Sequence, residues 1–478
     1  MRTGACTNPS SASNPQQIHT FPKCSPCGHR SINAAAIRWR ANLCQLTDWE
    51  TMKREETGGS SIVTADNTGR TEEDENKNLE DLDVDDDSER KDPLGFLPLN
   101  GKAKEIANWI AVIIGIWILL NGVGMIGDGF KGIAGDRAEE LFSFAENPFV
   151  GLAIGIVATA IIQSSSTTTS IVVGMIAGGL PLNIAIPMLF GANMGTSVTS
   201  TLVALGLAGN KKQFQQGFSM ATVHDFFNLI AILIFFPLEM ITGFLGKTAT
   251  AIAPSLSGSG EGVVSGIFES IGDFIDMITE PLVGLASSLV EPLGDVWGGV
   301  VLAVLGIALI LFSIQFIGNI LNALLVGKAQ DILYAALGKN AFMGVLSGAA
   351  ITTLVQSSST TTALTVPLAA SGKFKVRTLF PFVVGANIGT TVTGLIAAFS
   401  ASGTEAEAAM AGALVHTLFN TFAAILILGV PFLRKLPPKG SDWLAGMATK
   451  NKLYVFAWIG GVFFIIPILA VFISNALS

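Results

Sequence analysis

Two seven-residue polar runs interrupt long hydrophobic stretches of this chain and constrain its fold more than any other feature. Both runs read QSSSTTT, at residues 163–169 and 356–362, inside the apolar regions 148–180 and 341–371. Seven consecutive polar residues cover every face of a helix, so no rotation of a simple membrane helix hides them from lipid. Each flanking arm has about fifteen residues, which is too short to cross a bilayer. The pattern therefore predicts two re-entrant helical hairpins whose polar tips lie within protein at membrane depth.

The remaining hydrophobic sequence predicts ordinary membrane spans. Half of the 478 residues are hydrophobic and only 13% are charged, which exceeds what the core of a soluble domain requires. A membrane-spanning helix needs about 20 apolar residues. Seven further stretches meet this length, at residues 105–127, 184–206, 214–237, 297–320, 378–400, 409–433 and 453–474. The expected fold is an all-α polytopic membrane protein with about seven full spans plus two hairpins.

The distribution of charge predicts which segments face the cytoplasm, because Lys and Arg accumulate on that side. Expected cytoplasmic residues are Lys102, Lys104, Lys211, Lys212, Lys328, Lys339, Lys373, Lys375, Arg377, Arg434, Lys435, Lys439, Lys450 and Lys452. Segment 238–296 carries eight acids and one base, and segment 400–408 carries Glu405 and Glu407, so both are expected outside. With these sides the first hairpin enters from outside and the second from inside. The two halves are then inverted copies.

An internal sequence repeat agrees with that topology. QSSSTTT recurs after 193 residues, GANMGT at 191–196 recurs as GANIGT at 385–390, and HDFFN at 224–228 recurs as HTLFN at 416–420. Three colinear matches indicate a duplication. Inverted repeats with interrupted helices are typical of secondary transporters, whose binding site lies at the repeat interface near the bilayer midplane.

The chain divides into six expected regions. These are residues 1–51, a presequence or mis-assigned upstream extension; 52–101, an acidic disordered cytoplasmic tail; 102–237, repeat 1; 238–296, an extracellular linker; 297–433, repeat 2; and 434–478, a cytoplasmic loop with the final span. Within the linker, 263–290 has apolar residues at helical spacing between acidic ones. This pattern predicts an amphipathic helix on the outer membrane surface.

The N-terminal region allows two interpretations. Residues 1–47 contain five bases and no acid, as organellar transit peptides do, but Met52 is an alternative start.

Segment 71–92 holds twelve acids against three bases. Its net negative charge exceeds the formal charge of −8 of the whole chain, so net charge indicates no nucleic-acid partner. All four cysteines lie in the first 44 residues, and no finger-type ligand spacing accompanies them. We expect no metal other than sodium and no cofactor.

The polar elements suit the binding of an oxyanion together with a small cation. A broken helix presents free N–H groups that attract anions and free carbonyl groups that attract cations. Hydroxyl and amide side chains serve either partner. No GxxxxGK[ST] loop is present, which predicts that an ion gradient drives transport, and no nucleophile lies near a histidine base and an acid. The sequence therefore predicts a transporter and not an enzyme.

Each polar element also has a purely structural interpretation. Ser and Thr in membrane helices often bond to the preceding turn, Gly-Ala-Asn elements serve helix packing, and His224 and His416 can simply join helices. An acid in a hydrophobic stretch usually marks an ion pathway. Asp225 is therefore a candidate cation ligand, although the alternative is a solvated helix end beside Lys211 and Lys212.

At these residues the chain resembles the type II sodium/phosphate cotransporter family, whose hallmark is a QSSS motif in each of two inverted repeats. The resemblance covers about residues 102–433. It implies a phosphate site formed by Gln163, Ser164, Ser165, Ser166, Thr167, Gln356, Ser357, Ser358, Ser359 and Thr360. For sodium it implies Asn193, Thr196, Asn228 and Thr390, and the predicted set also includes Asn387 and the acid Asp225.

The implied function is sodium-coupled import of inorganic phosphate. In the family, Asp at the position of Asp225 goes with electrogenic transport. The alternatives are a transporter of another oxyanion, a phosphate exporter, and a channel or non-transporting membrane protein. The expected location is the plasma membrane, or an organellar membrane if 1–51 is a transit peptide. The sequence leaves the oligomeric state open.

Overall fold

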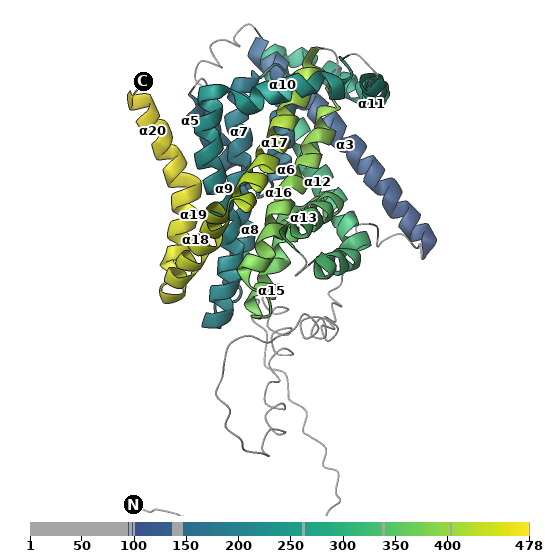
Figure 1. Cartoon of the computed structure of the whole chain (residues 1–478). Helices are drawn as coiled ribbons and strands as arrows, with labels where there is room; N and C mark the ends of the chain where they lie inside the picture. The colour runs from purple at the N-terminus through teal and green to yellow at the C-terminus, as the bar shows by residue number, and fades with distance from the viewer. Residues whose placement is uncertain are drawn as a thin grey trace, which may run out of the picture. The chain divides into compact units, whose positions relative to one another are not determined.

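The computed structural model describes a helical membrane protein (Figure 1). The described residues are 94, 98, 101–135, 147–260, 263–336, 340–401 and 404–477, all within one compact unit, Leu82–Ser478. The expected presequence 1–51 and nearly all of the expected acidic tail 52–101 lie outside them. Every regular element in the described part of the chain is a helix, which confirms the all-α fold class.

The described helices follow one another along the chain in three groups. The first half contains α3 (Lys102–Ala134), α5 (Pro148–Ile162), α6 (Ser165–Ala177), α7 (Leu182–Met194), η3 (Gly195–Ser197), α8 (Val198–Leu205), α9 (Lys211–Thr242), α10 (Phe244–Ser257) and α11 (Val263–Val290). After η4 (Glu291–Leu293), the second half contains α12 (Asp295–Ala336), α13 (Ala341–Val355), α14 (Ser358–Ala363), α15 (Thr365–Ala370), α16 (Val376–Ala398) and α17 (Thr404–Gly429). The chain then continues through α18 (Pro431–Lys450), α19 (Leu453–Gly460), the π-helical η5 (Gly461–Ile465) and α20 (Ile466–Leu477).

Seven of these helical segments are long and apolar enough to cross a membrane. They are Lys102–Ala134, Leu182–Leu205, Lys211–Thr242, Asp295–Leu321, Val376–Ala398, Glu405–Gly429 and Leu453–Ala476. Each coincides with one of the seven predicted stretches, so that prediction is confirmed. The two regions with polar runs instead form shorter helices, because α5 and α13 each end at the glutamine of the run.

Close glycine contacts show that α5 and α7 run in the same direction. A Cβ on Gly151 would lie 3.0 Å from Pro187 Cβ, and one on Gly195 would lie 2.6 Å from the Ala160 nitrogen. The contact nearer the start of α5 is thus also nearer the start of α7, and the contact near the end of α5 lies at the end of α7. α6 connects the end of α5 to the start of α7.

The second half repeats this packing. A Cβ on Gly344 would lie 3.0 Å from Pro381 Cβ, and one on Gly389 would lie 3.1 Å from the Thr353 nitrogen, so α13 and α16 are also parallel. All four residues are the repeat equivalents of those that join α5 and α7. The second half differs at Leu364, where the helix after the polar run divides into α14 and α15.

The first long helices of the two halves, α3 and α12, pack against each other in opposite directions. A Cβ on Gly129 would lie 2.7 Å from the Ala303 nitrogen, whereas one on Gly115 would lie 2.5 Å from Ile317 Cγ1. The Ser313 hydroxyl strengthens the pair by donating to the Gly115 carbonyl at 2.5 Å. Antiparallel α3 and α12 bring the chain into the two repeats from opposite ends.

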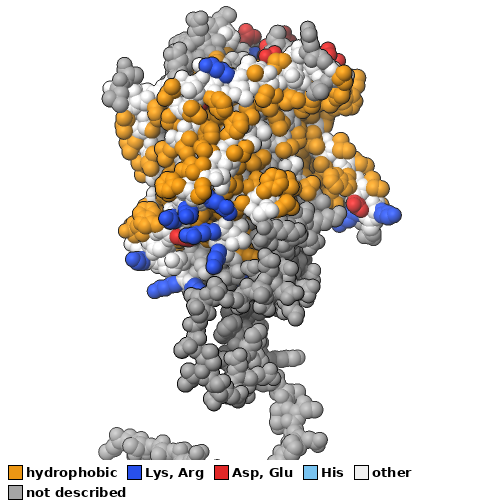
Figure 2. Space-filling model, in the orientation of Figure 1, with side chains coloured by type: hydrophobic (Ala, Val, Ile, Leu, Met, Phe, Trp, Pro, Cys, Tyr) orange, Lys and Arg blue, Asp and Glu red, His pale blue; other side chains and the backbone are white. Residues whose placement is uncertain are grey.

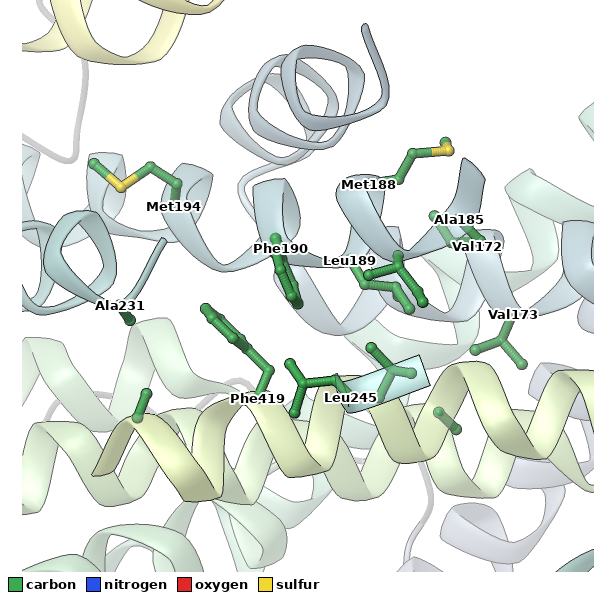
Figure 3. Packing of buried hydrophobic residues seen from close by; sticks show 14 of the residues in the cluster. Val172, Val173, Ala185, Met188, Leu189, Phe190, Met194, Ala231, Leu245 and Phe419 are labelled. Atoms are coloured by element: carbon green, nitrogen blue, oxygen red, sulfur yellow. The ribbon is translucent and has the colours of Figure 1, made fainter. Parts of the chain in front are cut away.

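Buried aromatic and aliphatic side chains from both halves form the central core. Figure 3 shows Phe190 of α7 facing Phe419 of α17, and their rings stack with centroids 4.4 Å apart. Such a pair contributes about 1 kcal/mol beyond its burial. The core therefore joins the two repeats directly.

The surface separates charge from apolar side chains. Figure 2 shows a broad hydrophobic band, with most of the visible Lys and Arg below it and most of the visible Asp and Glu above it. In Figure 1, α10 and α11 lie across the upper end of the bundle. Ile267, Ile271 and Phe274 of α11 are exposed, as expected for the apolar face of an amphipathic helix.

Candidate functional site

The first polar run lies at the junction of α5 and α6. Gln163 ends α5 in the left-handed conformation, with φ 59° and ψ 27°. Ser164 then starts α6, because its hydroxyl accepts a hydrogen bond from the Thr167 N–H at 3.2 Å. This N-cap satisfies one of the unpaired N–H groups of the first turn. The run therefore forms a sharp turn followed by a helix N-terminus.

The second polar run has the same geometry. Gln356 has φ 55° and ψ 26°, and the Ser357 hydroxyl accepts from the Thr360 N–H at 3.2 Å. Gln163 and Gln356 are the two non-glycine residues with positive φ among the described residues. This conformation costs a residue with a Cβ about 1–2 kcal/mol. Both repeats have glutamine, and not glycine, in this strained conformation. We infer that the glutamine side chains have a role that glycine lacks.

Two hydroxyls in each run bond to each other and hold the turn. Thr167 donates to Ser164 Oγ at 2.8 Å, and Ser357 donates to Thr360 Oγ1 at 2.9 Å. The second and third serines of each run make no side-chain hydrogen bond to any described residue. These are Ser165, Ser166, Ser358 and Ser359. Four serine hydroxyls at equivalent places thus retain their hydrogen-bonding capacity for a ligand.

Each glutamine connects its turn to the neighbouring span. Thr199 donates to Gln163 Oε1 at 3.4 Å, and its equivalent Thr393 donates to Gln356 Oε1 at 2.7 Å. Neither threonine was among the predicted site residues. The signal that identifies them is that the repeat extends past GANxGT to Thr199 and Thr393, which stand 194 residues apart.

The two repeats are joined by reciprocal hydrogen bonds. His224 Nε2 of repeat 1 is bonded to Asn387 Oδ1 of repeat 2, and His416 Nε2 of repeat 2 is bonded to Asn193 Oδ1 of repeat 1 at 3.2 Å. Because an amide oxygen only accepts, each imidazole donates from Nε2. Equivalent residues of the two repeats therefore make the same kind of contact in both directions.

Asn228 extends this network. Its amide nitrogen donates to the Asn193 carbonyl at 2.8 Å, and its amide oxygen accepts from Asn387 Nδ2 at 2.7 Å. All three asparagines are at most 3% exposed. The structure therefore brings three of the predicted sodium residues together with both histidines.

The two predicted threonines lie one helical turn beyond the asparagines of this network. Thr196 donates to the Ala192 carbonyl at 3.5 Å and Thr390 donates to the Ala386 carbonyl at 2.9 Å. Each hydroxyl therefore bonds to its own helix, as many membrane hydroxyls do. A donated proton leaves the oxygen lone pairs available to a cation.

Asp225, next to His224 on α9, is bonded to a helix outside both repeats. Its side chain is fully buried, and Oδ2 accepts a hydrogen bond from Trp458 Nε1 of α19 at 2.8 Å. The alternative that Asp225 sits at a solvated helix end is therefore wrong. Sequence reasoning did not single out Trp458, because it lies outside both repeats and no motif surrounds it.

The arrangement combines two polar turns with buried carbonyl, amide and carboxylate oxygens. Serine hydroxyls and helix N–H groups are suited to an oxyanion. Amide and carboxylate oxygens are ligands for hard cations. Among the described residues no three His, Cys, Asp or Glu side chains form a transition-metal cluster. The geometry favours reversible binding of an anion and a small cation at the repeat interface.

Comparisons with known proteins agree with this chemistry. The chain matches the protein family described as Na+/Pi-cotransporter over residues 118–253 and 309–433. It is 28% identical to sodium-dependent phosphate transport protein 2B of Bos taurus, over 77% of this chain and 65% of that protein. It is 26% identical to protein 2B of Homo sapiens, over 74% of this chain and 63% of that protein.

A third relative is sodium-dependent phosphate transport protein 2A of Ovis aries, 27% identical over 76% of this chain and 67% of that protein. The chain thus spans slightly less than two thirds of the length of the type 2B relatives. No solved structure matches the chain. The family match covers more than half of the chain, including both polar runs and both His–Asn pairs. The chain belongs to the Na+/Pi-cotransporter family.

Proposed function

We propose that this protein is a sodium-coupled symporter that imports inorganic phosphate by alternating access, and that it is not an enzyme. The observation that carries the proposal is the pair of equivalent polar turns with serine hydroxyls that no described residue engages. Family membership supports sodium and phosphate as the cargo. The relatives are named as sodium-dependent phosphate transport proteins.

Phosphate binding is assigned to the two QSSST segments. The serines Ser165, Ser166, Ser358 and Ser359 replace the hydration of the anion, while Ser164, Thr167, Ser357 and Thr360 hold the turns in shape. Gln163 and Gln356 are held by Thr199 and Thr393, which directs their amides. Two sets of neutral donors suit an anion that must be released again.

Sodium binding is assigned to the oxygens around the His–Asn network. The residues are Asn193, Thr196, Asn228, Asn387 and Thr390, with Asp225 supplying a formal negative charge. Sodium prefers such oxygen ligands because it is a hard cation. A cation bound here also contacts residues of both repeats, which would couple its binding to their relative position.

Two packing patterns support inverted repeats with re-entrant hairpins. Parallel α5 and α7 require α6 to turn back, and parallel α13 and α16 require the same of α14 and α15. The helices that lead into the repeats, α3 and α12, are antiparallel. A two-fold axis that relates antiparallel helices lies across them, hence in the membrane plane.

Asp225 supports electrogenic transport. Two sodium ions with one divalent phosphate carry no net charge, whereas a third sodium carries one positive charge inward. A buried carboxylate offers that third ion a favourable site, and repeat 2 has Thr417 in its place. An inside-negative potential would then favour uptake by about 2.3 kcal/mol per charge per 100 mV.

Uptake of radiolabelled phosphate into proteoliposomes tests the proposal. An inward sodium gradient should drive accumulation, a potassium gradient should not, and a potassium-diffusion potential, inside negative, should accelerate the sodium-driven flux. Asp225→Gly should retain some uptake and lose the current. Sodium-independent flux would point to a channel, and sulfate or arsenate uptake without phosphate uptake would assign another oxyanion. Sodium-driven efflux alone would assign an exporter.

The proposed location is the plasma membrane, with α11 on the outer surface and the basic end in the cytoplasm. Exposed apolar residues of α11 support its contact with lipid. The gathering of Lys and Arg at the opposite end supports this orientation (Figure 2). An organellar membrane is the alternative if residues 1–51 direct import.

A further inference from the structure

The C-terminal helices α18 and α19 attach to α9, which carries Asp225. The Phe226 ring stacks on the Trp458 indole with centroids 4.8 Å apart. Phe226 also contacts Gly440 of α18, where a Cβ would lie 2.5 Å from the ring. Only glycine lets α18 approach this closely. Phe226 is thus held between α18 and α19.

Polar contacts also join α18 to α9 nearer the start of α9. The Ser219 hydroxyl donates to Asp442 Oδ1 at 2.6 Å and lies 3.1 Å from Ser441 Oγ. Between α18 and α19, the Lys452 ammonium lies 2.7 Å from the centroid of the Phe214 ring of α9. Burial lowers the pKa of Lys452 from its usual value. These contacts hold α18 and the residue that precedes α19 against α9.

This attachment orients the Trp458 indole toward the Asp225 carboxylate. The indole nitrogen is a donor only, and it donates to Oδ2 at 2.8 Å. A carboxylate offers about four acceptor positions, so one indole bond leaves the group able to bind a cation as well. The bond also offsets part of the cost of burying a charge at a fully buried position.

We infer that Trp458 is a positioning residue for the Asp225 carboxylate, so that the last span, beyond the residues matched by the family, tunes the binding of the coupling cation. The inference rests on the proposed sodium coupling. Groups that orient a ligand from outside the coordination shell typically change metal affinity by about tenfold or more. Trp458 occupies that position relative to Asp225.

Trp458→Phe is the sharpest test, because it keeps an aromatic ring for Phe226 and removes only the N–H donor and part of the ring. We expect the sodium concentration for half-maximal uptake to rise by about tenfold. The phosphate KM at saturating sodium should stay unchanged, since the polar turns are not altered. A purely structural role would lower the amount of folded protein without separating the two constants.

Two controls make the result specific. Trp443→Phe changes an exposed tryptophan of α18, and its sodium dependence should equal that of the unmodified protein. In the Asp225→Asn background, Trp458→Phe should cause no further change, because the indole acts through the carboxylate. An unchanged or lowered sodium requirement in Trp458→Phe, or an equal shift in Trp443→Phe, overturns the inference.

A binding measurement separates this inference from the transport proposal. Sodium, but not potassium, should raise the melting temperature of the purified protein, because a ligand that binds the folded state stabilises it. Trp458→Phe should need more sodium for the same shift. An unchanged midpoint overturns the role of Trp458 whether or not phosphate is transported. Absent sodium-driven uptake together with a normal thermal response would overturn only the transport proposal.

Discussion

At the scale of single residues, neighbouring hydroxyls in each polar run have different roles. Ser164 and Ser357 cap helices, whereas Ser165 and Ser358 are buried and bond to no described side chain. A cap contributes to folding, while a hydroxyl that remains available contributes to ligand binding. Substitutions at adjacent positions should therefore affect stability and transport separately.

Ser165→Ala should abolish or severely reduce phosphate uptake with little change in stability, because it removes a ligand donor and no structural hydrogen bond. Ser164→Ala should lower stability by about 1 kcal/mol through loss of the cap. The measurements are proteoliposome uptake and thermal unfolding in detergent. Ser358→Ala and Ser357→Ala provide the same comparison in repeat 2. Normal uptake by both Ser165→Ala and Ser358→Ala would remove the phosphate-site assignment.

His224 and His416 act across the repeat interface. His416→Ala leaves the buried Asn193 oxygen without its donor, which should cost about 1–3 kcal/mol. His224→Ala should cost a similar amount through Asn387. Thermal unfolding of each single variant checks this. Thr417→Ala is the matched control, because that hydroxyl bonds only to the Ala413 carbonyl of its own helix. A larger loss in the control than in His416→Ala would show that the cross-repeat bonds are unimportant.

At the scale of helices, the packing of each polar turn depends on backbone contact between parallel helices. Gly155 lies against the Met188 carbonyl, and its equivalent Gly348 lies against the Phe382 carbonyl. Neither carbonyl can move away as a flexible side chain does. The turn at Gln163 or Gln356 is therefore positioned by the helix beside it as much as by its own residues.

Gly155→Ala should consequently destabilise the protein by about 1–3 kcal/mol and reduce uptake, because the added methyl forces α5 away from α7. Gly348→Ala should have the same effect on α13 and α16. For comparison, Gly272→Ala on α11 meets no atom within 4 Å and should be tolerated. Its helix propensity improves by about 1 kcal/mol. Equal stability of all three variants would contradict the close packing of these helices.

At the scale of the whole molecule, charge and packing together define the proposed orientation. Antiparallel α3 and α12 bring the chain into the two halves from opposite ends. Lys and Arg gather at one end, and α10 and α11 lie across the other (Figures 1 and 2). The proposed inverted repeats require these ends to face opposite sides of the membrane.

Cysteine labelling tests this orientation. Ser270→Cys on α11 and Ser371→Cys between α15 and α16 both introduce a thiol at an exposed position. After replacement of the four native cysteines, an impermeant maleimide should label Ser270→Cys on intact cells. Ser371→Cys should react only after permeabilisation. Labelling of both variants from the same side would contradict the proposed topology.

Much of the fold follows from the sequence alone, because its determinants are local. Span lengths reflect bilayer thickness, and a polar run that covers every helix face must interrupt a membrane helix. The colinear repeats likewise predicted that residues such as Asn193 and Asn387 act as equivalents. The ends of α5 and α13 lie where the polar runs begin.

The tertiary structure alone decided which side chains meet across the fold. His224 and Asn387 are 163 positions apart, and Asp225 and Trp458 are 233 positions apart. Such contacts depend on how helices pack and rotate, which hydrophobic length and repeat spacing leave open. Periodicity therefore located Asp225 in a membrane helix, but only the packing of the C-terminal helices showed that its carboxylate accepts a hydrogen bond from Trp458.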